Sequence, residues 1–509
     1  MQIVPPSGYQ PLVSIIVPMT DDVEESSQRL ALAKAQSWHH LEVIPVEIQA
    51  TAGLGQALNK GFAASQGEFV SLLLPGASYT HDKITRQVAF VAQFDLQDAV
   101  LFCDYTVLDG RNSGGVPVVL PSLDPAAMFR KIHCGLPIDC SSLLVPRKAM
   151  VDLGLFPGLE GQAALQGFLL ALSQHTNLVG MAASLVSISE RAQLSCVEKR
   201  DFRKLYADFL PELVRLNEST THDANVFSTL GEAAAARLSQ GLPLAAWDIF
   251  CAACKLLGQS EKALSALRLF AIPLLRSALR RLPIGIKRRL RSTLPDKTEE
   301  TGSRLDFSAI YRDNGFVGTE SLSGAGSTRF QTRIIRQKLP ELFRELGVRS
   351  VLDIPCGDFH WMRDVDLADI HYIGADLVDD MVQRNQQRFG NPLRAFECVN
   401  LITGPLPVAD LVFCRDCLVH LPYEDALAAL DTIRQSKCQW LLTTTFTRAT
   451  PNTDLDAAGW RALNLTLPPF NLPPPTRLIS EKCTEAGGLA GDKSLGLWRI
   501  ADLQLFKQA

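Results

Sequence analysis

The stretch Val351–Trp361, VLDIPCGDFHW, decides the fold of the C-terminal part of this 509-residue chain. Apolar residues run into Asp353, and a tight turn that holds Cys356, Gly357 and Asp358 follows them. We expect a helix after the turn, so the stretch predicts a strand–turn–helix unit that opens an α/β domain. In open parallel sheets, the turn after the first strand is a place where nucleotides bind.

A second predicted strand, Tyr372–Ala375, ends on Asp376, which lies 23 residues beyond Asp353. A carboxylate in that place can accept hydrogen bonds from both ribose hydroxyls of an adenosine. Further elements alternate after it: a helix over 379–389 and strands near 396–399, over 409–414 and over 439–445. This alternation predicts a mostly parallel sheet.

The stretch resembles motif I of class I S-adenosylmethionine-dependent methyltransferases, commonly written hhDhGxGxG. Asp353 keeps the acid and Gly357 keeps the central glycine, whereas Pro355 and Phe359 replace the first and third glycines. A dinucleotide needs those glycines so that its pyrophosphate can approach the backbone. S-adenosylmethionine has no pyrophosphate, so the departures argue against NAD more than against a sulfonium cofactor. The resemblance predicts a Rossmann-like methyltransferase domain over residues 304–509.

The resemblance also implies which residues bind S-adenosylmethionine: Asp353, Pro355, Cys356, Gly357, Asp376, Asn400 and Arg415. In the family pattern an acid near Asn400 contacts the adenine amino group, and an asparagine oxygen can accept that hydrogen bond. A small-residue loop upstream, 324–328, could fold over the cofactor, and Arg329 after it could meet a carboxylate. A plain helix-capping turn is the alternative interpretation of this loop.

The segment after the fourth strand, Arg415–Leu421, resembles the loop of small-molecule methyltransferases that ends in a His-Leu pair. Because reactive side chains lie at the carboxyl ends of strands in open α/β sheets, we expect Asp416 and His420 to contact the acceptor. His420 is the candidate general base, with Asp416 as its orienter or as an alternative base. A platform for a sugar acceptor is predicted from three residues: Trp460, Arg461 and Asn464. No metal-ligand cluster is evident.

Residues 1–195 predict a second α/β domain. The segments 11–18, 41–47 and 68–74 have the pattern of buried strands, and 53–67 has that of a helix. The order SIIVP, then LGQALNKGFAASQGEFVSLLL, resembles family-2 glycosyltransferases with the GT-A fold. In that family this region leads into an acidic DxD-type motif that binds a metal ion.

The acidic residues that this resemblance predicts are absent or altered at three places. Leu73–Ala77 stands at the metal site, and its side chains offer no oxygen ligands to a divalent cation. Glu47–Gln49 replaces the acid after the second strand, and Gly161–Gly167 replaces the acidic pair that includes the base. Asp104 and Asp82 remain as isolated acids. We therefore expect a degenerate glycosyltransferase-like domain that binds a glycan or a partner, or that serves only as a scaffold.

Residues 196–303 predict a helical connector. Within it, Lys262–Arg291 carries nine Lys or Arg residues and no acid, interleaved with apolar residues. Such a stretch can lie on an anionic membrane surface, and a solvated basic face is the equal alternative. Two CxxC pairs, Cys251/Cys254 and Cys414/Cys417, have the pattern of small buried residues rather than of zinc ligands.

The composition is that of an ordinary soluble protein, with 47% hydrophobic and 20% charged residues. A net charge of -4 offers no general case for nucleic-acid binding. Twelve cysteines lack a regular framework, which favours reduced cytosolic thiols. With neither a signal peptide nor a long apolar run evident, we expect a cytoplasmic protein with peripheral contact at the inner face of a membrane.

These features predict an S-adenosylmethionine-dependent enzyme that O-methylates a glycan, or a glycolipid or glycoprotein acceptor, which the N-terminal domain binds. Two alternatives stay open. One is a bifunctional glycosyltransferase and methyltransferase of surface-polysaccharide synthesis, and the other is a non-catalytic scaffold.

Overall fold

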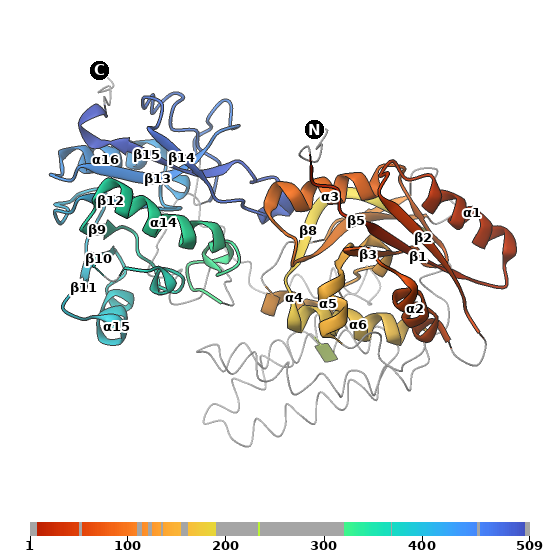
Figure 1. Cartoon of the computed structure of the whole chain (residues 1–509). Helices are drawn as coiled ribbons and strands as arrows, with labels where there is room; N and C mark the ends of the chain where they lie inside the picture. Colours follow the sequence, from red (N-terminus) through yellow and green to blue (C-terminus); the bar gives the residue numbers. More distant parts are fainter. Residues whose placement is uncertain are drawn as a thin grey trace, which may run out of the picture. The chain divides into compact units, whose positions relative to one another are not determined.

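The structure is a computed structural model that divides between Lys297 and Thr298 into two compact units (Figure 1). The residues that it describes are 8–49, 53–108, 115–120, 125–133, 136–153, 161–189, 233–234, 320–367, 369–455 and 459–503. The predicted helical connector, with its basic stretch and the pair Cys251/Cys254, lies outside these residues apart from 233–234.

The first unit holds two four-stranded sheets, with orders β2-β1-β3-β7 and β4-β8-β5-β6. Strand β1 pairs in parallel with β2 and β3, and six of its seven residues are buried. This burial explains the continuous apolar run, because a parallel strand is covered on both faces. The strands are β1 (Val13–Met19), β2 (Leu41–Glu47), β3 (Phe69–Leu72), β4 (Ala77–Tyr79), β5 (Val100–Leu108), β6 (Val116–Val118), β7 (Val145–Pro146) and β8 (Leu178–Ser189).

The helices of this unit alternate with the strands, which gives the mixed α/β arrangement of a GT-A-like, Rossmann-type domain. They are α1 (Val23–Lys34), α2 (Gly53–Ala64), α3 (Lys83–Phe94), α4 (Pro125–His133), α5 (Arg147–Asp152) and α6 (Gly161–His175), with the short 3-10 turn η1 (Cys140–Ser142).

The second unit holds one seven-stranded sheet of order β11-β10-β9-β12-β13-β15-β14. Its neighbours are parallel as far as β13, and β15 then runs antiparallel to both β13 and β14. This is a Rossmann-like sheet, with five parallel strands followed by an antiparallel pair at one edge. The strands are β9 (Ser350–Asp353), β10 (His371–Asp376), β11 (Arg394–Cys398), β12 (Leu411–Cys414), β13 (Trp440–Phe446), β14 (Arg477–Ser480) and β15 (Lys493–Arg499).

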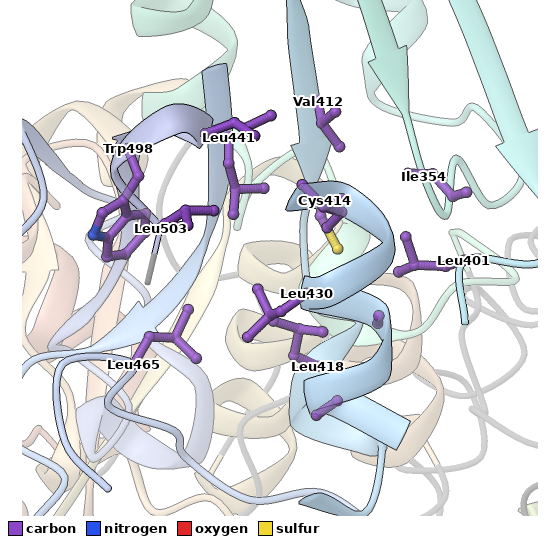
Figure 2. Close-up of a cluster of buried hydrophobic side chains, with 14 of the residues drawn as sticks. Ile354, Leu401, Val412, Cys414, Leu418, Leu430, Leu441, Leu465, Trp498 and Leu503 are labelled. Atoms are coloured by element: carbon purple, nitrogen blue, oxygen red, sulfur yellow. The ribbon is translucent and has the colours of Figure 1, made fainter. Parts of the chain in front are cut away.

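The sheet of the second unit has a hydrophobic core on each face. Along β12, Leu411 and Phe413 pack in one core, which includes α14 (Arg333–Leu346) and part of α15 (Asp379–Phe389). Val412 and Cys414 pack in the other core, against α16 (Tyr423–Gln435). Figure 2 shows the second core, where Leu418, Leu430 and Trp498 also lie. This alternation is what a strand buried on both faces requires.

The prediction of a helix after the first strand is wrong, because the described residues between β9 and β10 hold only the 3-10 turn η3 (Met362–Asp364). Phe359 has a φ of 54°, in the left-handed region that interrupts a right-handed helix. Its ring packs with its centroid 5.1–5.3 Å from those of Tyr372, Phe389 and Phe396. Burial of this aromatic ring in the core therefore takes the place of a helix.

Among the described residues, no helix has both the length and the apolar character that crossing a bilayer requires.

Candidate functional site

A cavity of about 360 Å³ lies at the carboxyl ends of the parallel strands of the second unit. This is the place where the strand order reverses, since β10 and β11 lie on one side of β9 and β12 and β13 on the other. The residues that line it follow four strands: 353–358 after β9, 376–378 after β10, 399–402 after β11, and Arg415, Asp416, Cys417, His420 and Leu421 after β12.

Gly357 and Asp376 join the first two of these strand ends. The backbone N–H of Gly357 donates to Oδ2 of Asp376 at 3.1 Å, and that of Val378 donates to Oδ1 at 3.1 Å. Burial raises the pKa of Asp376, and these backbone hydrogen bonds oppose the rise. Each carboxylate oxygen can accept a second hydrogen bond, so Asp376 can still bind ribose hydroxyls.

Glycine is required at position 357 for two reasons. Its φ is +56°, and a Cβ atom there would lie 2.1 Å from Oγ of Ser323. Ser323 belongs to residues 320–328, called the strap here, which lie against the turn. The glycine thus lets the strap close on the turn.

The strap is held at both ends. Ser321 Oγ and Leu322 N donate to the two carboxylate oxygens of Asp358 at 2.9 and 2.8 Å, and Arg415 Nη2 donates to the carbonyl of Gly326 at 2.9 Å. Residues 322–327 line the cavity, where the sequence predicted a loop over the cofactor. Arg329 does not line the cavity, and it pairs with Asp364 at 2.7 Å. The expected contact of Arg329 with a ligand carboxylate is corrected accordingly.

Asp353 is the buried acid of the motif, and Tyr372 donates its hydroxyl hydrogen to it. Burial raises the pKa of Asp353 to about 7, and the neighbouring charge of Asp376 adds to the rise. Its charge therefore changes near neutral pH. Pro355 and Cys356 line the cavity beside it, as the sequence predicted for the cofactor site.

Asn400 also lines the cavity, but its oxygen is used within its own loop. It accepts hydrogen bonds from the backbone N–H groups of Ile402 and Thr403 at 2.8 and 3.4 Å. The expected role of this oxygen as acceptor for an adenine amino group is corrected accordingly: the NH₂ of Asn400 is the group suited to a ligand.

Arg415 and Asp416 belong to a buried ionic network that the sequence did not reveal. Arg415 Nη2 lies 2.7 Å from Glu481, and its Nη1 lies 3.2 Å from Oδ2 of Asp416. Lys493 Nζ lies 2.5 Å from the same oxygen, and 3.7 Å from Glu485. The guanidinium of Arg415 is thus bound by protein partners, and it holds the strap and Asp416 in place.

The network decides the chemistry of Asp416. Burial alone would raise the pKa of Asp416, but the charges of Arg415 and Lys493 hold it at about 2. A general base works best when its pKa is near the working pH. The alternative in which Asp416 is the base is therefore disfavoured.

His420 lines the cavity in the turn η4 (Leu418–His420). Its Nδ1 lies 2.8 Å from the carbonyl oxygen of Gly459. Because a carbonyl only accepts, Nδ1 carries the proton of the neutral ring, and Nε2 is the basic nitrogen. The predicted base thus has a defined tautomer.

Of the three residues predicted to form a sugar platform, only Trp460 lines the cavity, with its side chain half exposed. Arg461 is buried and donates to the carbonyls of Thr453 and Leu418 at 3.1 and 3.0 Å. Asn464 is buried too, and it accepts from the N–H and hydroxyl of Thr466 at 3.1 and 2.8 Å. The expectation for Arg461 and Asn464 is corrected, because both hold the loop together instead of facing the cavity.

The missed residues have weak signals in the sequence. Glu481 directly follows β14, and Lys493 is the first residue of β15. The signal is thus an ionisable residue next to the end of a strand. Their meeting depends on the antiparallel pairing of β15 with β13 and β14, which brings Lys493 opposite Phe446.

In the first unit, an ion pair occupies the turn where the resemblance predicts a metal site. Arg29 is buried, pairs with Glu25 at 2.7 Å, and donates to the carbonyl of Leu73 at 3.1 Å. Glu25 in turn accepts from the N–H of Gly76 at 2.9 Å. No group of three or more His, Cys, Asp or Glu side chains that could hold a metal occurs among the described residues, Cys414 and Cys417 included.

Comparisons with known proteins find higher sequence identity to a glycosyltransferase than to a methyltransferase. No protein-family model matches it. An uncharacterized glycosyltransferase of Rickettsia typhi is 27% identical over 176 residues, which are 29% of this chain and 54% of that protein. An uncharacterized glycosyltransferase of Rickettsia felis is 27% identical over 175 residues, which are 29% of each. The chain spans about half the length of the first relative and less of the second.

Solved structures with likeness to the chain include a glycosyltransferase and a methyltransferase. Staphylococcus aureus TarS 1–349, in complex with UDP-GlcNAc, is 17% identical with a TM-score of 0.36, over 45% of this chain and 73% of that one. Magnesium protoporphyrin IX methyltransferase from Synechocystis PCC 6803, with bound SAH, is 19% identical with a TM-score of 0.23, over 31% and 81%.

Part of the chain is therefore similar in sequence to proteins named as glycosyltransferases, and its two units have mixed α/β folds.

Proposed function

We propose that the chain is an S-adenosylmethionine-dependent methyltransferase that methylates a hydroxyl group of a glycan or glycosylated acceptor. The observation that carries the proposal is the convergence of Gly357, Asp376 and His420 on one cavity at the carboxyl ends of β9, β10 and β12. The first two suit the ribose and backbone approach of an adenosine, and His420 suits an acceptor hydroxyl.

The charges of the cavity favour a cationic ligand. Five acids line it, Asp353, Asp358, Asp376, Asp416 and Glu485, against the two cations Arg415 and Lys493. Opposite charges nearby stabilise a sulfonium, whose positive charge makes its methyl group transferable. A pyrophosphate cofactor would meet repulsion in the same place.

The residues of the chain can then divide the reaction between them. Gly357 and Asp376 would hold S-adenosylmethionine, which would supply an electrophilic methyl group to the acceptor oxygen and keep the electron pair of the broken carbon–sulfur bond on its sulfur. The hydroxyl proton passes to Nε2 of His420, which is oriented by its bond to Gly459. The strap lines one side of the cavity, where it would limit the access of water to the reacting atoms.

We propose further that the glycosyltransferase-like part binds the acceptor. A binding domain tethered to a methyl-transfer site raises the effective concentration of their shared substrate. The support is the similarity of the N-terminal part to glycosyltransferases, which is an analogy of fold and sequence and not of site.

Calorimetry of the full chain with S-adenosylhomocysteine tests the cofactor assignment. We expect binding, and we expect Asp376→Ala to weaken it by about 1–3 kcal/mol, the loss of hydrogen bonds to a buried carboxylate. Asp379→Ala, in the exposed first turn of α15, is the matched control and leaves the affinity unchanged. Equal affinities of the wild type and Asp376→Ala would remove Asp376 from the site.

A bifunctional enzyme is the second candidate, favoured by the 27% identity to proteins named as glycosyltransferases. Turnover of a nucleotide sugar by the chain would distinguish it.

A further inference from the structure

We propose that Lys493 and Arg415 hold Asp416 as an ionised hydrogen-bond acceptor for a second acceptor hydroxyl, so that the enzyme prefers acceptors with two neighbouring hydroxyl groups. This inference rests on the proposed function and assigns to it a substrate class, vicinal diols. Asp416 contacts the substrate, and Lys493 acts through it as a positioning residue.

The first step is the unusual backbone of Asp416. Its φ is 52°, in the left-handed region that side-chain-bearing residues seldom adopt. The conformation is fixed from two other strands: Asp416 N donates to Oγ1 of Thr444 on β13 at 2.9 Å, and Lys493 on β15 donates to Oδ2 at 2.5 Å. These two hydrogen bonds thus offset the backbone strain and hold the carboxylate in one place at the cavity wall.

The second step is the remaining hydrogen-bonding capacity of this carboxylate. Both cations bind Oδ2, from Lys493 Nζ at 2.5 Å and Arg415 Nη1 at 3.2 Å. Among the described residues, Oδ1 accepts only a long hydrogen bond from Oγ1 of Thr444, at 3.5 Å. An ionised oxygen with a vacant lone pair that borders a cavity is suited to a hydroxyl donor.

The third step is the place of His420. It follows Asp416 by four residues, in the turn η4, and both line the same cavity. Both line one cavity, and the charge of the protonated His420 ring acts on Asp416, so a base and an anion lie near each other there, which suits two hydroxyls on adjacent carbons. The hydroxyl near Nε2 of His420 loses its proton and is methylated, while its neighbour donates to Asp416 and keeps its proton.

Lys493 is what makes Asp416 an acceptor instead of a base. Without it, Asp416 would share Arg415 with the buried Glu481, and Glu485 would lose its nearest cation. Such a concentration of carboxylates favours their protonated forms and frees the turn to relax. We therefore expect substitution of Lys493 to change the reaction in the same way as substitution of Asp416.

The test measures methyl transfer from radiolabelled S-adenosylmethionine by the full chain to a panel of methyl hexopyranosides and to their monodeoxy analogues. The wild type is expected to methylate a diol at least tenfold faster than the analogue that lacks the neighbouring hydroxyl. Asp416→Asn, Lys493→Met and the double variant are expected to lose that discrimination equally, with no further loss in the double variant. Arg477→Met is the control and keeps the discrimination: Arg477 lies on β14, next to the strand of Lys493, and forms an exposed ion pair with Glu345 of α14.

Binding of S-adenosylhomocysteine, measured in parallel, reports folding and separates the two hypotheses. Binding without methylation of any diol, equal rates on diols and deoxy analogues, or additive losses in the double variant would overturn the diol proposal and leave the cofactor assignment standing. Absence of binding by the wild type would overturn the proposed function, and this inference with it. The comparison of acceptors uses the wild type alone, so it stands even if a variant fails to fold.

Discussion

Gly357 and Phe359 show how single residues of the motif divide between chain geometry and core packing. Both have positive φ, at 56° and 54°, although only one is a glycine. The strained backbone of Phe359 is offset by the packing of its ring in an aromatic cluster. Gly357 instead faces Ser323 of the strap, where there is no room for a Cβ. The loss of the third glycine therefore changes the core and not the turn.

Gly357→Ala is predicted to weaken S-adenosylhomocysteine binding at least tenfold, because its Cβ would lie 2.1 Å from Ser323 Oγ and because its φ is +56°. Calorimetry measures the change. The double variant Gly357→Ala/Ser323→Gly should regain part of the affinity by removing the clash while the backbone strain remains. Full affinity in Gly357→Ala would show that the strap does not close on this turn.

Asp353 is predicted to make the stability of the second unit depend on pH between about 4 and 7. Its pKa is about 7 in the folded chain, against an ordinary value near 3.8, so the folded state binds more protons in that range. The stabilisation is complete below the ordinary value and is lost as pH rises through the folded one. The free energy of unfolding should therefore fall with rising pH, by at most a few kcal/mol.

Thermal unfolding of the wild type and of Asp353→Asn at pH 5 and pH 8 checks this dependence. Asparagine can still accept the hydrogen bond from Tyr372, so the variant isolates the charge. We expect a smaller difference between the two pH values in Asp353→Asn than in the wild type. Equal differences would mean that Asp353 does not titrate in this range.

At the scale of elements, the sequence predicts the strands of the second unit well and their long-range contacts poorly. The helix predicted over 379–389 coincides with α15, and each of the later parallel strands lies within three residues of its predicted bounds. Apolar runs mark such strands because both faces are buried. The pairing within the sheet β4-β8-β5-β6 has no such local mark, since the paired residues of β5 and β8 lie about 80 positions apart in the sequence.

The candidate site divides in the same way. The place of residues at or shortly after the end of a strand, such as Asp376 and His420, could be predicted, because the strand end fixes it. Lys493 could not, because its contact with Asp416 depends on sheet pairing, 77 residues away in the sequence. The sequence predicts Arg461 and Asn464 as ligand-facing residues because a polar side chain that bonds to its own loop has the same sequence signal.

The basic stretch Lys262–Arg291 is predicted to give salt-sensitive binding to anionic vesicles, because nine cations alternate with apolar residues. Reversing four of the charges, as Arg280→Glu, Arg281→Glu, Arg288→Glu and Arg289→Glu, should abolish co-sedimentation at low salt. The matched control reverses four exposed cations of the second unit: Lys338, Arg344, Arg384 and Lys437. A wild type that ignores anionic vesicles would identify the stretch as an ordinary connector.

For the whole molecule, the last prediction is that the chain does not transfer sugars from nucleotide sugars, although its N-terminal part is glycosyltransferase-like. A nucleotide diphosphate leaving group gains negative charge as the glycosidic bond breaks, and a divalent cation held by carboxylates usually neutralises it. Here Leu74 is buried at the metal site, and the ion pair of Arg29 with Glu25 binds the turn around it.

The isolated acids of this unit have other partners. Asp104 accepts a hydrogen bond from the N–H of Leu120 at 2.8 Å, and burial raises its pKa, which weakens it as a metal ligand. Asp82 accepts from the hydroxyl of Thr80 at 2.9 Å and lies 3.8 Å from Arg86. Two single carboxylates, each already bonded, make a poor site for Mn²⁺, which prefers several oxygen ligands.

We therefore expect no Mn²⁺-dependent hydrolysis or transfer by the full chain across a panel of nucleotide sugars, measured as released nucleotide diphosphate. Asp104→Ala should leave methyl transfer unchanged unless this unit positions the acceptor, in which case KM rises while kcat stays, because acceptor binding is lost without a change in the chemical step. Robust, Mn²⁺-dependent sugar transfer that Asp104→Ala abolishes would contradict the prediction. It would mean that one carboxylate and the backbone suffice for the metal, and it would make the bifunctional enzyme the first candidate.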